Sequence, residues 1–223
     1  MRRRNVKNAK ERLLAQEEVM IFNPTDYKGK WHELFNNNNP IYLEIGMGKG
    51  KFIIKHAQTY PNHNYLGLEK YDSVILQATT KLQELSLDNL KLINVDASNL
   101  LEIFQEGEVD GIYLNFSDPW PKARHAKRRL TSKKFLDIYR TILKKDGIIE
   151  FKTDNVDLFD YSVESFEENN YEILHLTRDL HSEAKDVITT EYEDKFSSKG
   201  NNICFLKARW KKWKKHTLVH SIK

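Results

Sequence analysis

The chain of 223 residues contains one cysteine, Cys204, and no long apolar run. A single cysteine excludes an internal disulfide and any zinc site built from cysteines. No stretch approaches the roughly 18 apolar residues that a membrane-spanning helix needs. The basic start of the chain, residues 1–4, has no apolar segment behind it, so it does not read as a secretory signal. These absences predict a globular, cytoplasmic protein that is not associated with a membrane.

Acidic side chains are nearly missing from three segments, although the net charge of the whole chain is only +4. Residues 1–12 carry six Lys/Arg and one acid, while 122–134 and 207–223 each carry seven Lys/Arg and no acid. An acidic body with basic patches is the distribution expected of a protein that binds a phosphate backbone. Each segment alone is equally compatible with a solvated helix face or a basic tail.

Apolar strands and helical segments alternate five times in the middle of the chain. Strands are expected at 41–45, 64–69, 90–95, 112–115 and 147–152, with helices at 51–59, 73–85, 99–104, 132–143 and 156–169. This alternation predicts an α/β fold with a mostly parallel sheet and helices on both faces. Two last strands, 171–177 and 203–207, are joined by a polar loop of about 25 residues, which predicts an antiparallel strand. We therefore expect seven strands.

The ends of the chain are predicted to extend beyond this α/β unit. Residues 1–30 are polar and predict a basic N-terminal arm with a helical piece over 8–18. Residues 31–210 form the predicted domain, and 211–223 a basic C-terminal tail. Whether the protein is a monomer or a homodimer does not follow from this pattern.

A glycine-rich turn, Glu-Ile-Gly-Met-Gly-Lys-Gly (44–50), follows the first strand directly. Glycines here let the backbone turn sharply and approach a ligand. The spacing differs from the dinucleotide pattern G-x-G-x-x-G, because position 51 is lysine. Glu44 would lie close to a diphosphate, which is unfavourable, whereas its charge suits the sulfonium and ammonium of S-adenosylmethionine. Gly46, Gly48 and Glu44 are therefore candidate cofactor residues.

Acids also end the next two strands. Glu69 follows the second strand, where a carboxylate can bind both ribose hydroxyls in either a NAD or an S-adenosylmethionine site. Asp96 follows the third, where it can accept a hydrogen bond from an adenine amino group. Each acid alone is equally compatible with a helix cap. Together with Glu44 and Asp118 they lie at four strand ends that converge on one crevice.

The fourth strand ends in Asn-Phe-Ser-Asp-Pro-Trp-Pro-Lys (115–122), which begins the second basic segment. Two prolines and a tryptophan cannot continue a sheet interior, so the strand stops here. Asp118, Trp120 and the basic residues after it therefore offer a carboxylate, an aromatic plane and phosphate-binding charges at one strand end. Trp120 either stacks on an extruded base or packs the turn.

Residues 115–130 resemble the signature of bacterial tRNA (guanine-N7)-methyltransferases of the TrmB type. The similarity runs from 44–50 through Glu69, Asp96 and Phe-Lys-Thr-Asp (151–154) to Thr-Glu-Tyr-Glu (190–193), and covers roughly residues 40–207. Many members have Phe-Pro-Asp where this chain has Phe-Ser-Asp. The serine leaves the turn less constrained than a proline would. The resemblance implies a class I, Rossmann-like fold and methyl transfer from S-adenosylmethionine, without a metal, to N7 of guanosine 46 in the tRNA variable loop.

The resemblance also implies a role for each matched residue. Asp118 is the catalytic candidate, because it can accept from the guanine N1–H and N2–H edge or stabilise the cationic purine. The cofactor would be bound by Glu44, Gly46, Gly48, Glu69, Asp96 and Asp118. The nucleoside would be held by Lys122, Asp154, Thr190, Glu191, Tyr192 and Glu193. The tRNA would be contacted by Arg124, His125, Lys127, Arg128 and Arg129.

Two other functions fit parts of the sequence. A nicotinamide-dependent oxidoreductase could be built on the same sheet, but the glycine spacing and Glu44 argue against it. A non-catalytic RNA-binding module would have no need of acids at four strand ends. The sequence favours the methyltransferase.

Overall fold

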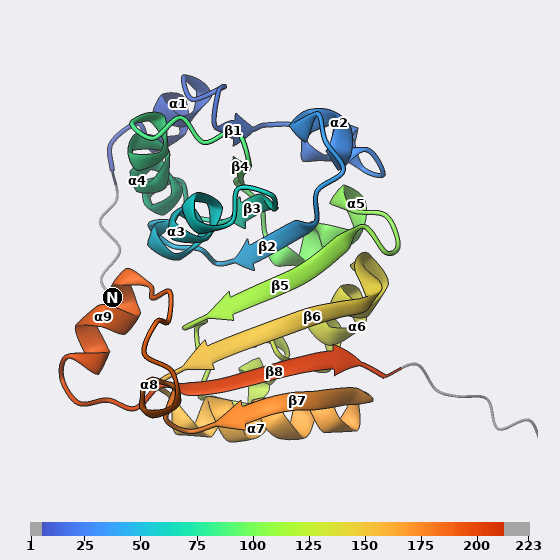
Figure 1. The fold of residues 1–223 in the computed structure, drawn as a ribbon, viewed down its shortest axis with the longest axis vertical. Coiled ribbons are helices and arrows are strands. Elements are labelled where there is room, and N and C mark those ends of the chain that lie inside the picture. The colour runs from blue at the N-terminus through green and yellow to red at the C-terminus, as the bar shows by residue number, and fades with distance from the viewer. Residues whose placement is uncertain (1–5, 212–223) are drawn as a thin grey trace, which may run out of the picture.

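The computed structural model describes residues 6–211, in which helices cover both faces of one eight-stranded sheet (Figure 1). The strands are β1 Met20–Ile21, β2 Ile41–Ile45, β3 Asn64–Leu68, β4 Leu90–Ile93, β5 Val109–Asn115, β6 Leu143–Thr153, β7 Tyr171–Thr177 and β8 Cys204–Trp210. The α-helices are α1 Ala9–Leu14, α2 Trp31–Phe35, α3 Lys51–Thr59, α4 Asp72–Gln83, α5 Leu100–Ile103, α6 Lys133–Ile142, α7 Val156–Glu168, α8 Leu180–Glu183 and α9 Glu191–Ser197. Short 3-10 helices are η1 Pro24–Tyr27, η2 Ala97–Asn99 and η3 Ala123–Arg128.

The strand order is β1-β4-β3-β2-β5-β6-β8-β7, and β8 alone runs antiparallel to its two neighbours among the described strands. The predicted mostly parallel sheet with one antiparallel strand is therefore confirmed. The predicted number of seven strands is wrong, because β1 adds an eighth strand beside β4. A strand of two residues is too short to show the alternation from which strands are predicted.

Apolar side chains alternate between the two faces of the sheet and build a core on each. In β2, Leu43 packs into the core that contains α6 and α7, whereas Tyr42 contacts the core that contains α1, α3 and α4. This period of two follows from the pleat of a strand. The predicted helices on both faces are confirmed.

The described part of the predicted N-terminal arm packs onto the domain. Ala9 and Leu13 of α1 are buried beside α4, and Val19 and Met20 continue the same core up to β4. The segment from 6 to 30 therefore contributes to the core. Of the predicted C-terminal tail, residues 212–223 lie outside the described part of the chain, so only Lys211 is placed.

The long connection between β7 and β8 was expected to be a loop without helices, and this expectation is wrong. It contains α8 and α9. The helix α9 begins with a capping box, in which the Thr190 hydroxyl accepts from the Glu193 amide and the Glu193 carboxylate accepts from the Thr190 amide. This pattern of Thr and Glu three residues apart is a helix-start signal that was visible in the sequence.

The strand order reverses direction at β2, which lies between β3 and β5. In open α/β sheets such a switch point at the carboxyl ends of the strands is where ligands bind. Figure 1 shows α9 lying at this end of the sheet, near the carboxyl ends of β5 and β6. Within residues 6–211 no helix is long and apolar enough to cross a membrane.

Candidate active site

A cavity of ≈ 2050 Å³ opens at the carboxyl ends of the central strands. The glycine turn, the ends of β3 and β4, the loop after β5 and the start of α9 all contribute to its wall. Eleven of the predicted site residues line this cavity: Glu44, Gly46, Gly48, Glu69, Asp96, Asp118, Lys127, Arg128, Thr190, Glu191 and Tyr192. Residues from four strand ends and from a distant helix thus meet in one place.

The glycine turn forms the floor of the cavity beside β2. Gly46 and Gly48 have φ values of 77° and 60°, a left-handed conformation that side chains rarely adopt. A Cβ atom at either position would meet nothing within 4 Å, so the space above the turn is open. The turn is fixed to β3, because the amides of Gly46 and Met47 both donate to the Leu68 carbonyl. The result is exposed backbone facing a space in which a ligand fits.

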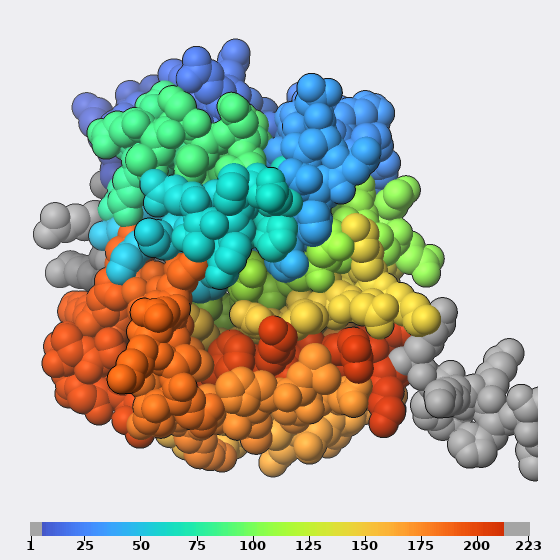
Figure 2. All heavy atoms as spheres, viewed as in Figure 1, coloured from blue at the N-terminus to red at the C-terminus, as the bar shows by residue number. Residues whose placement is uncertain are grey.

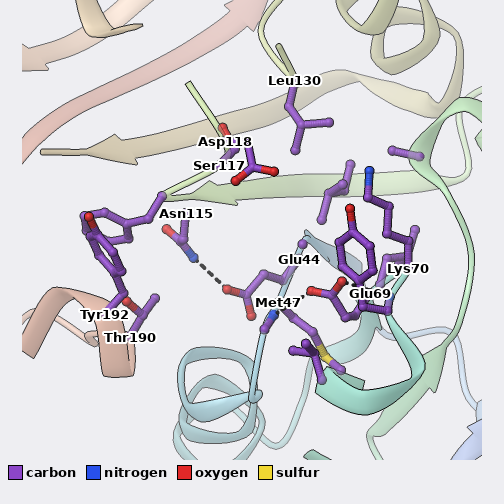
Figure 3. A pocket seen from close by; sticks show the side chains of 18 of the residues that line it. Glu44, Met47, Glu69, Lys70, Asn115, Ser117, Asp118, Leu130, Thr190 and Tyr192 are labelled. Atoms are coloured by element: carbon purple, nitrogen blue, oxygen red, sulfur yellow. Dashed lines mark hydrogen bonds between the residues drawn. The ribbon is translucent and has the colours of Figure 1, made fainter. Parts of the chain in front are cut away.

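Glu44 is a buried carboxylate in the cavity wall, and its pKa is strongly raised. Its side chain is buried, and Asn115 of β5 donates a hydrogen bond of 2.9 Å to Oε1 (Figure 3). Oε2 has no hydrogen-bond partner among the described residues. Burial raises the pKa of Glu44 to about 8, and the bond from Asn115 opposes that shift only in part. A buried carboxylate oxygen without a partner beside an open space is suited to a cationic ligand.

Glu69 lies at the end of β3 with both carboxylate oxygens engaged by backbone. Oε2 accepts from the Gly48 amide at 3.3 Å and Oε1 from the Tyr71 amide at 3.1 Å. Burial raises the pKa of this carboxyl, and the backbone hydrogen bonds oppose the rise. Glu69 therefore ties the glycine turn to β3 and presents its carboxylate in the wall of the cavity.

Asp96 follows β4 at the rim of the cavity and also caps η2. Its Oδ1 accepts from the backbone amide of Ser98 at 2.9 Å and from the Ser98 hydroxyl at 2.7 Å. Burial alone would raise the pKa of Asp96, but the two bonds from Ser98 and the nearby Lys70 and Lys134 outweigh it, so the pKa is lowered. The cap that was an alternative to a ligand role is present, and Asp96 still lines the cavity.

The loop after β5 brings Asp118 to the cavity between two strained residues. Phe116 and Trp120 have φ values of 51° and 43°, which is costly for large side chains and is typical of functional loops. Arg129 fixes the loop by donating to the carbonyls of Pro119 at 3.0 Å and Trp120 at 3.2 Å. Figure 3 shows Asp118 on the opposite side of the cavity from Glu44 and Glu69. The Arg129 side chain thus fixes the backbone that follows Asp118.

The basic segment after this loop divides into two parts. Lys127 and Arg128 line the cavity, whereas Lys122, Arg124 and His125 do not. The side chains of Lys122 and Arg124 are exposed, as a phosphate-binding surface requires. Arg129 is half-buried, and its guanidinium lies 4.2 Å from the ring centre of Tyr161, so its visible contacts support the loop.

Trp120 packs the turn, which is one of its two predicted arrangements, and stacking on an extruded base stays a prediction. Its ring lines the cavity and packs against Arg128, whose guanidinium lies 4.9 Å from the ring centre. The imidazole of His125 contacts it edge-on at 5.7 Å. The indole therefore packs the turn while one part of it faces the cavity.

The start of α9 forms the wall opposite β3. Tyr192 donates a hydrogen bond of 3.2 Å to Asp154, and its ring lies 4.9 Å from that of Phe116 and 4.2 Å from that of Phe196. Burial and the neighbouring Asp154 raise the pKa of Tyr192 to about 12, so the hydroxyl stays protonated. Asp154 does not line the cavity itself but acts on it through this tyrosine.

Glu193 is placed differently from the other residues of its motif. It is fully buried, does not line the cavity, and its carboxylate lies 3.1 Å from the ammonium of Lys152. Glu193 also accepts a hydrogen bond from the Thr190 amide, so its contacts hold the start of α9 in place. Its neighbour Glu191 lines the cavity and forms an ion pair with Lys81.

Several cavity residues were not predicted from the sequence. Asn115, which orients Glu44, stands in the quoted signature, but its contact depends on the register of β2 against β5. Lys70, Lys134 and Lys195 come from three different elements and add positive charge to the wall. The side chains of the described residues contain no cluster of three or more His, Cys, Asp or Glu that could hold a metal ion.

Comparison with known proteins identifies the family. A family model described as "Putative methyltransferase" matches residues 38–206. A tRNA (guanine-N(7)-)-methyltransferase of Geobacillus sp. (strain WCH70) is 51% identical over 91% of this chain and 93% of its own length. The proteins of the same name from Lachnoclostridium phytofermentans and Bacillus subtilis are 52% and 46% identical, over 91% and 95% of this chain and 95% and 100% of their own.

Solved structures show the same fold at much lower identity. The 16S rRNA methyltransferase KamB has a TM-score of 0.65 at 15% identity and covers 82% of this chain and 94% of its own. An antibiotic-related methyltransferase gives a TM-score of 0.62 at 16% identity, over 81% of this chain and 92% of its own. These likenesses establish the Rossmann-like methyltransferase fold. The family model and the relatives at 46–52% identity show that the chain belongs to the tRNA (guanine-N(7)-)-methyltransferase family.

Proposed function

We propose that this protein transfers a methyl group from S-adenosylmethionine to N7 of guanosine 46 in the variable loop of tRNA. One observation carries the proposal. Glu44, whose Oε2 has no hydrogen-bond partner among the described residues, lines the same cavity as Asp118 and the cations Lys127 and Arg128. A site for a cationic small molecule and a surface for a phosphate backbone are thus contiguous. The names of the relatives support methyl transfer to N7 of guanine in tRNA.

The residues of the cavity fit the proposed cofactor. Glu44 offers a buried oxygen without a partner, and the turn at Gly46 and Gly48 leaves an open space beside it. In the proposed complex Glu44 holds positive charge, Glu69 accepts from ribose hydroxyls, and Asp96 accepts from the adenine amino group. When bound, S-adenosylmethionine supplies an electrophilic methyl group on a positively charged sulfur.

The proposed chemistry requires little from an acid or a base. N7 of guanine has a free lone pair and no proton, so no group has to deprotonate it. The protein has to align N7 with the methyl carbon and to tolerate the purine as it becomes cationic. In the proposed complex Asp118 does this by accepting from the N1–H and N2–H edge or through its charge. Its rigid loop and the aromatic contact between Tyr192 and Phe116 then define the position of the base.

The proposed tRNA surface extends from the cavity across η3. Lys127 and Arg128 lie at the cavity, while Lys122 and Arg124 continue outward as exposed cations. Phosphate contacts of this kind position a nucleic acid without reading its sequence. The choice of one guanosine would then come from the cavity, and the orientation of the tRNA from η3. A protein that acts on tRNA in this way belongs in the cytoplasm.

Methyl incorporation into matched tRNA transcripts tests this proposal. The purified protein is incubated with labelled S-adenosylmethionine and either a tRNA transcript with guanosine at position 46 or the same transcript with adenosine there. We expect label in the first transcript and none in the second. Equal labelling of both would refute the assignment to position 46, and no labelling of either would refute the proposed function.

A further inference from the structure

Lys152 of β6 is a buried cation that the proposed chemistry does not use. Its side chain is 5% exposed. Its ammonium donates a hydrogen bond of 2.8 Å to the Ile188 carbonyl and one of 3.1 Å to the Glu193 carboxylate. The ammonium also lies 5.1 Å from the ring centre of Phe52 in α3. Burial lowers the pKa of Lys152, and the charge of Glu193 opposes that shift. A buried charge of this kind requires an explanation, because its desolvation is costly.

Both partners of the Lys152 ammonium belong to the segment that builds the cavity wall at α9. Ile188 precedes the helix, and Glu193 is the third residue within it, where its carboxylate also closes the cap at Thr190. One ammonium therefore fixes the entry to α9 and its first turn at the same time. Thr190 and Tyr192, which face the cavity, lie between these two fixed points.

The backbone of Lys152 contacts the loop on the other side of the cavity. Its carbonyl accepts from the Phe116 amide at 2.9 Å, and in the sheet it pairs with Asn115. Phe116 is the first of the two strained residues around Asp118, and its ring contacts that of Tyr192. Lys152 is thus bonded through its backbone to the Asp118 loop and through its side chain to α9.

We propose that Lys152 is a positioning residue, which sets the distance between the Asp118 loop and the start of α9 so that a base fits between them. The proposal rests on the proposed function, in which those two segments hold the guanosine. Stability alone is a poor explanation for the pair with Glu193, since apolar residues of similar volume often stabilise a core as well as a buried ion pair does. Buried pairs of fixed geometry instead specify one arrangement.

Two further pairs between a lysine and a carboxylate hold α9, and they differ from this one in burial. Lys51 of α3 pairs with Asp194, and Lys81 of α4 pairs with Glu191 at 2.5 Å, with all four side chains between 35% and 49% exposed. Figure 2 shows the orange surface of this segment lying against the cyan surface of α3. Exposed ion pairs contribute little to stability, because solvent screens their charges. We therefore assign the placement of α9 to Lys152 and treat Lys51 as the matched control.

The charge of Lys152 also acts on the cofactor side of the cavity. It lowers the pKa of Glu44, against the larger effect of burial. The charged or titratable groups that face Lys152 and its partner are Glu44, His56, Glu150, His181 and Glu193. Removal of the ammonium should therefore move the pH dependence of cofactor binding to higher pH. A residue that served only the stability of the fold would not change this profile.

The experiment uses three test variants, which are Lys152→Met, Glu193→Gln and the double variant that combines both substitutions. Lys51→Met is the control. Glutamine at position 193 keeps the capping pattern while removing the charge. We expect Lys152→Met to raise the KM for tRNA by at least about tenfold with a smaller change in kcat. Lys51→Met should change the KM by less than about fivefold. If Lys152→Met is folded and keeps the KM and the pH profile of the wild type, the proposal is overturned.

Folding and activity are separated by two further measurements. The double variant leaves neither Lys152 nor Glu193 as an unpaired buried charge, so it should fold even if Lys152→Met does not. If neither variant at Lys152 folds, Glu193→Gln is measured in their place. A wild-type KM for tRNA in the folded variant would overturn the proposal. Hydrogen exchange of the α9 amides needs no activity, and we expect at least about tenfold faster exchange than in Lys51→Met. Unchanged exchange of the α9 amides overturns the positioning role, whether or not the protein is active on tRNA. Absence of activity on tRNA counts against the proposed function alone.

Discussion

Replacement of Glu44 by glutamine should make the free protein more stable while weakening cofactor binding. The carboxyl has an ordinary pKa of 4.5 when the chain is unfolded and a pKa of about 8 in the folded protein, because it is buried. A group whose pKa is raised by folding stabilises the protein below the lower value, and this stability is lost as the pH rises to the higher one. Glutamine carries no such penalty and still accepts the bond from Asn115.

The size of the effect follows from the two pKa values. At pH 7 the carboxyl is ionised in the unfolded chain but mostly protonated in the folded protein. This difference lowers the free energy of unfolding by about 3 kcal/mol relative to acidic solution. At pH 5 the same linkage gives about 1 kcal/mol. Glu44→Gln should therefore gain up to about 3 kcal/mol in the free energy of unfolding at pH 7, and the gain should shrink toward pH 5.

Urea denaturation of the cofactor-free protein at both pH values measures this difference. Glu164→Gln, an exposed substitution on α7, is the matched control and should change the free energy of unfolding by no more than about 0.5 kcal/mol. The same Glu44→Gln protein should bind S-adenosylmethionine at least about tenfold more weakly, since a charge-assisted contact is lost. A variant that is no more stable than wild type at pH 7, or whose gain does not depend on pH, would show that burial of Glu44 does not destabilise the free protein.

Three further predictions concern the cavity and its rim. Asp118→Ala should lower kcat by about 10² or more while changing the Kd for tRNA by less than about threefold, and turnover at the wild-type rate would remove Asp118 from the chemistry. Arg124→Ala combined with Arg128→Ala should weaken tRNA binding and reduce the slope of log K against log salt by about 2, whereas an unchanged slope would make this run a solvated face. The affinity for S-adenosylmethionine should rise from pH 6 to pH 8 as Glu44 ionises, and calorimetry that finds a flat profile would contradict the raised pKa.

The elements that position the site could be predicted because each carries a local signal. The alternation of apolar strands and helices predicted the parallel sheet, and the glycines after β2 predicted the turn. Acids directly after β3 and β4 were expected to converge, because the carboxyl ends of parallel strands lie on one edge. Glu69 and Asp96 indeed line one cavity with Glu44.

The remaining features depend on contacts between distant parts of the chain. Asn115 and Lys152 are polar residues within strands. The register of β2 against β5 brings Asn115 to Glu44, and the placement of α9 brings Glu193 to Lys152. Arg129 resembles its basic neighbours in the sequence, yet it contacts the carbonyls of its own loop. Sequence spacing cannot distinguish a cation that faces solvent from one that faces the protein.

Methyl transfer to N7 of guanine in tRNA is decided by the identity of the modified nucleoside. The wild-type protein is incubated with labelled S-adenosylmethionine and bulk tRNA that lacks the modification, and the RNA is then digested to nucleosides and separated. We expect the label in 7-methylguanosine. Label in any other nucleoside, or none in the RNA, would contradict it.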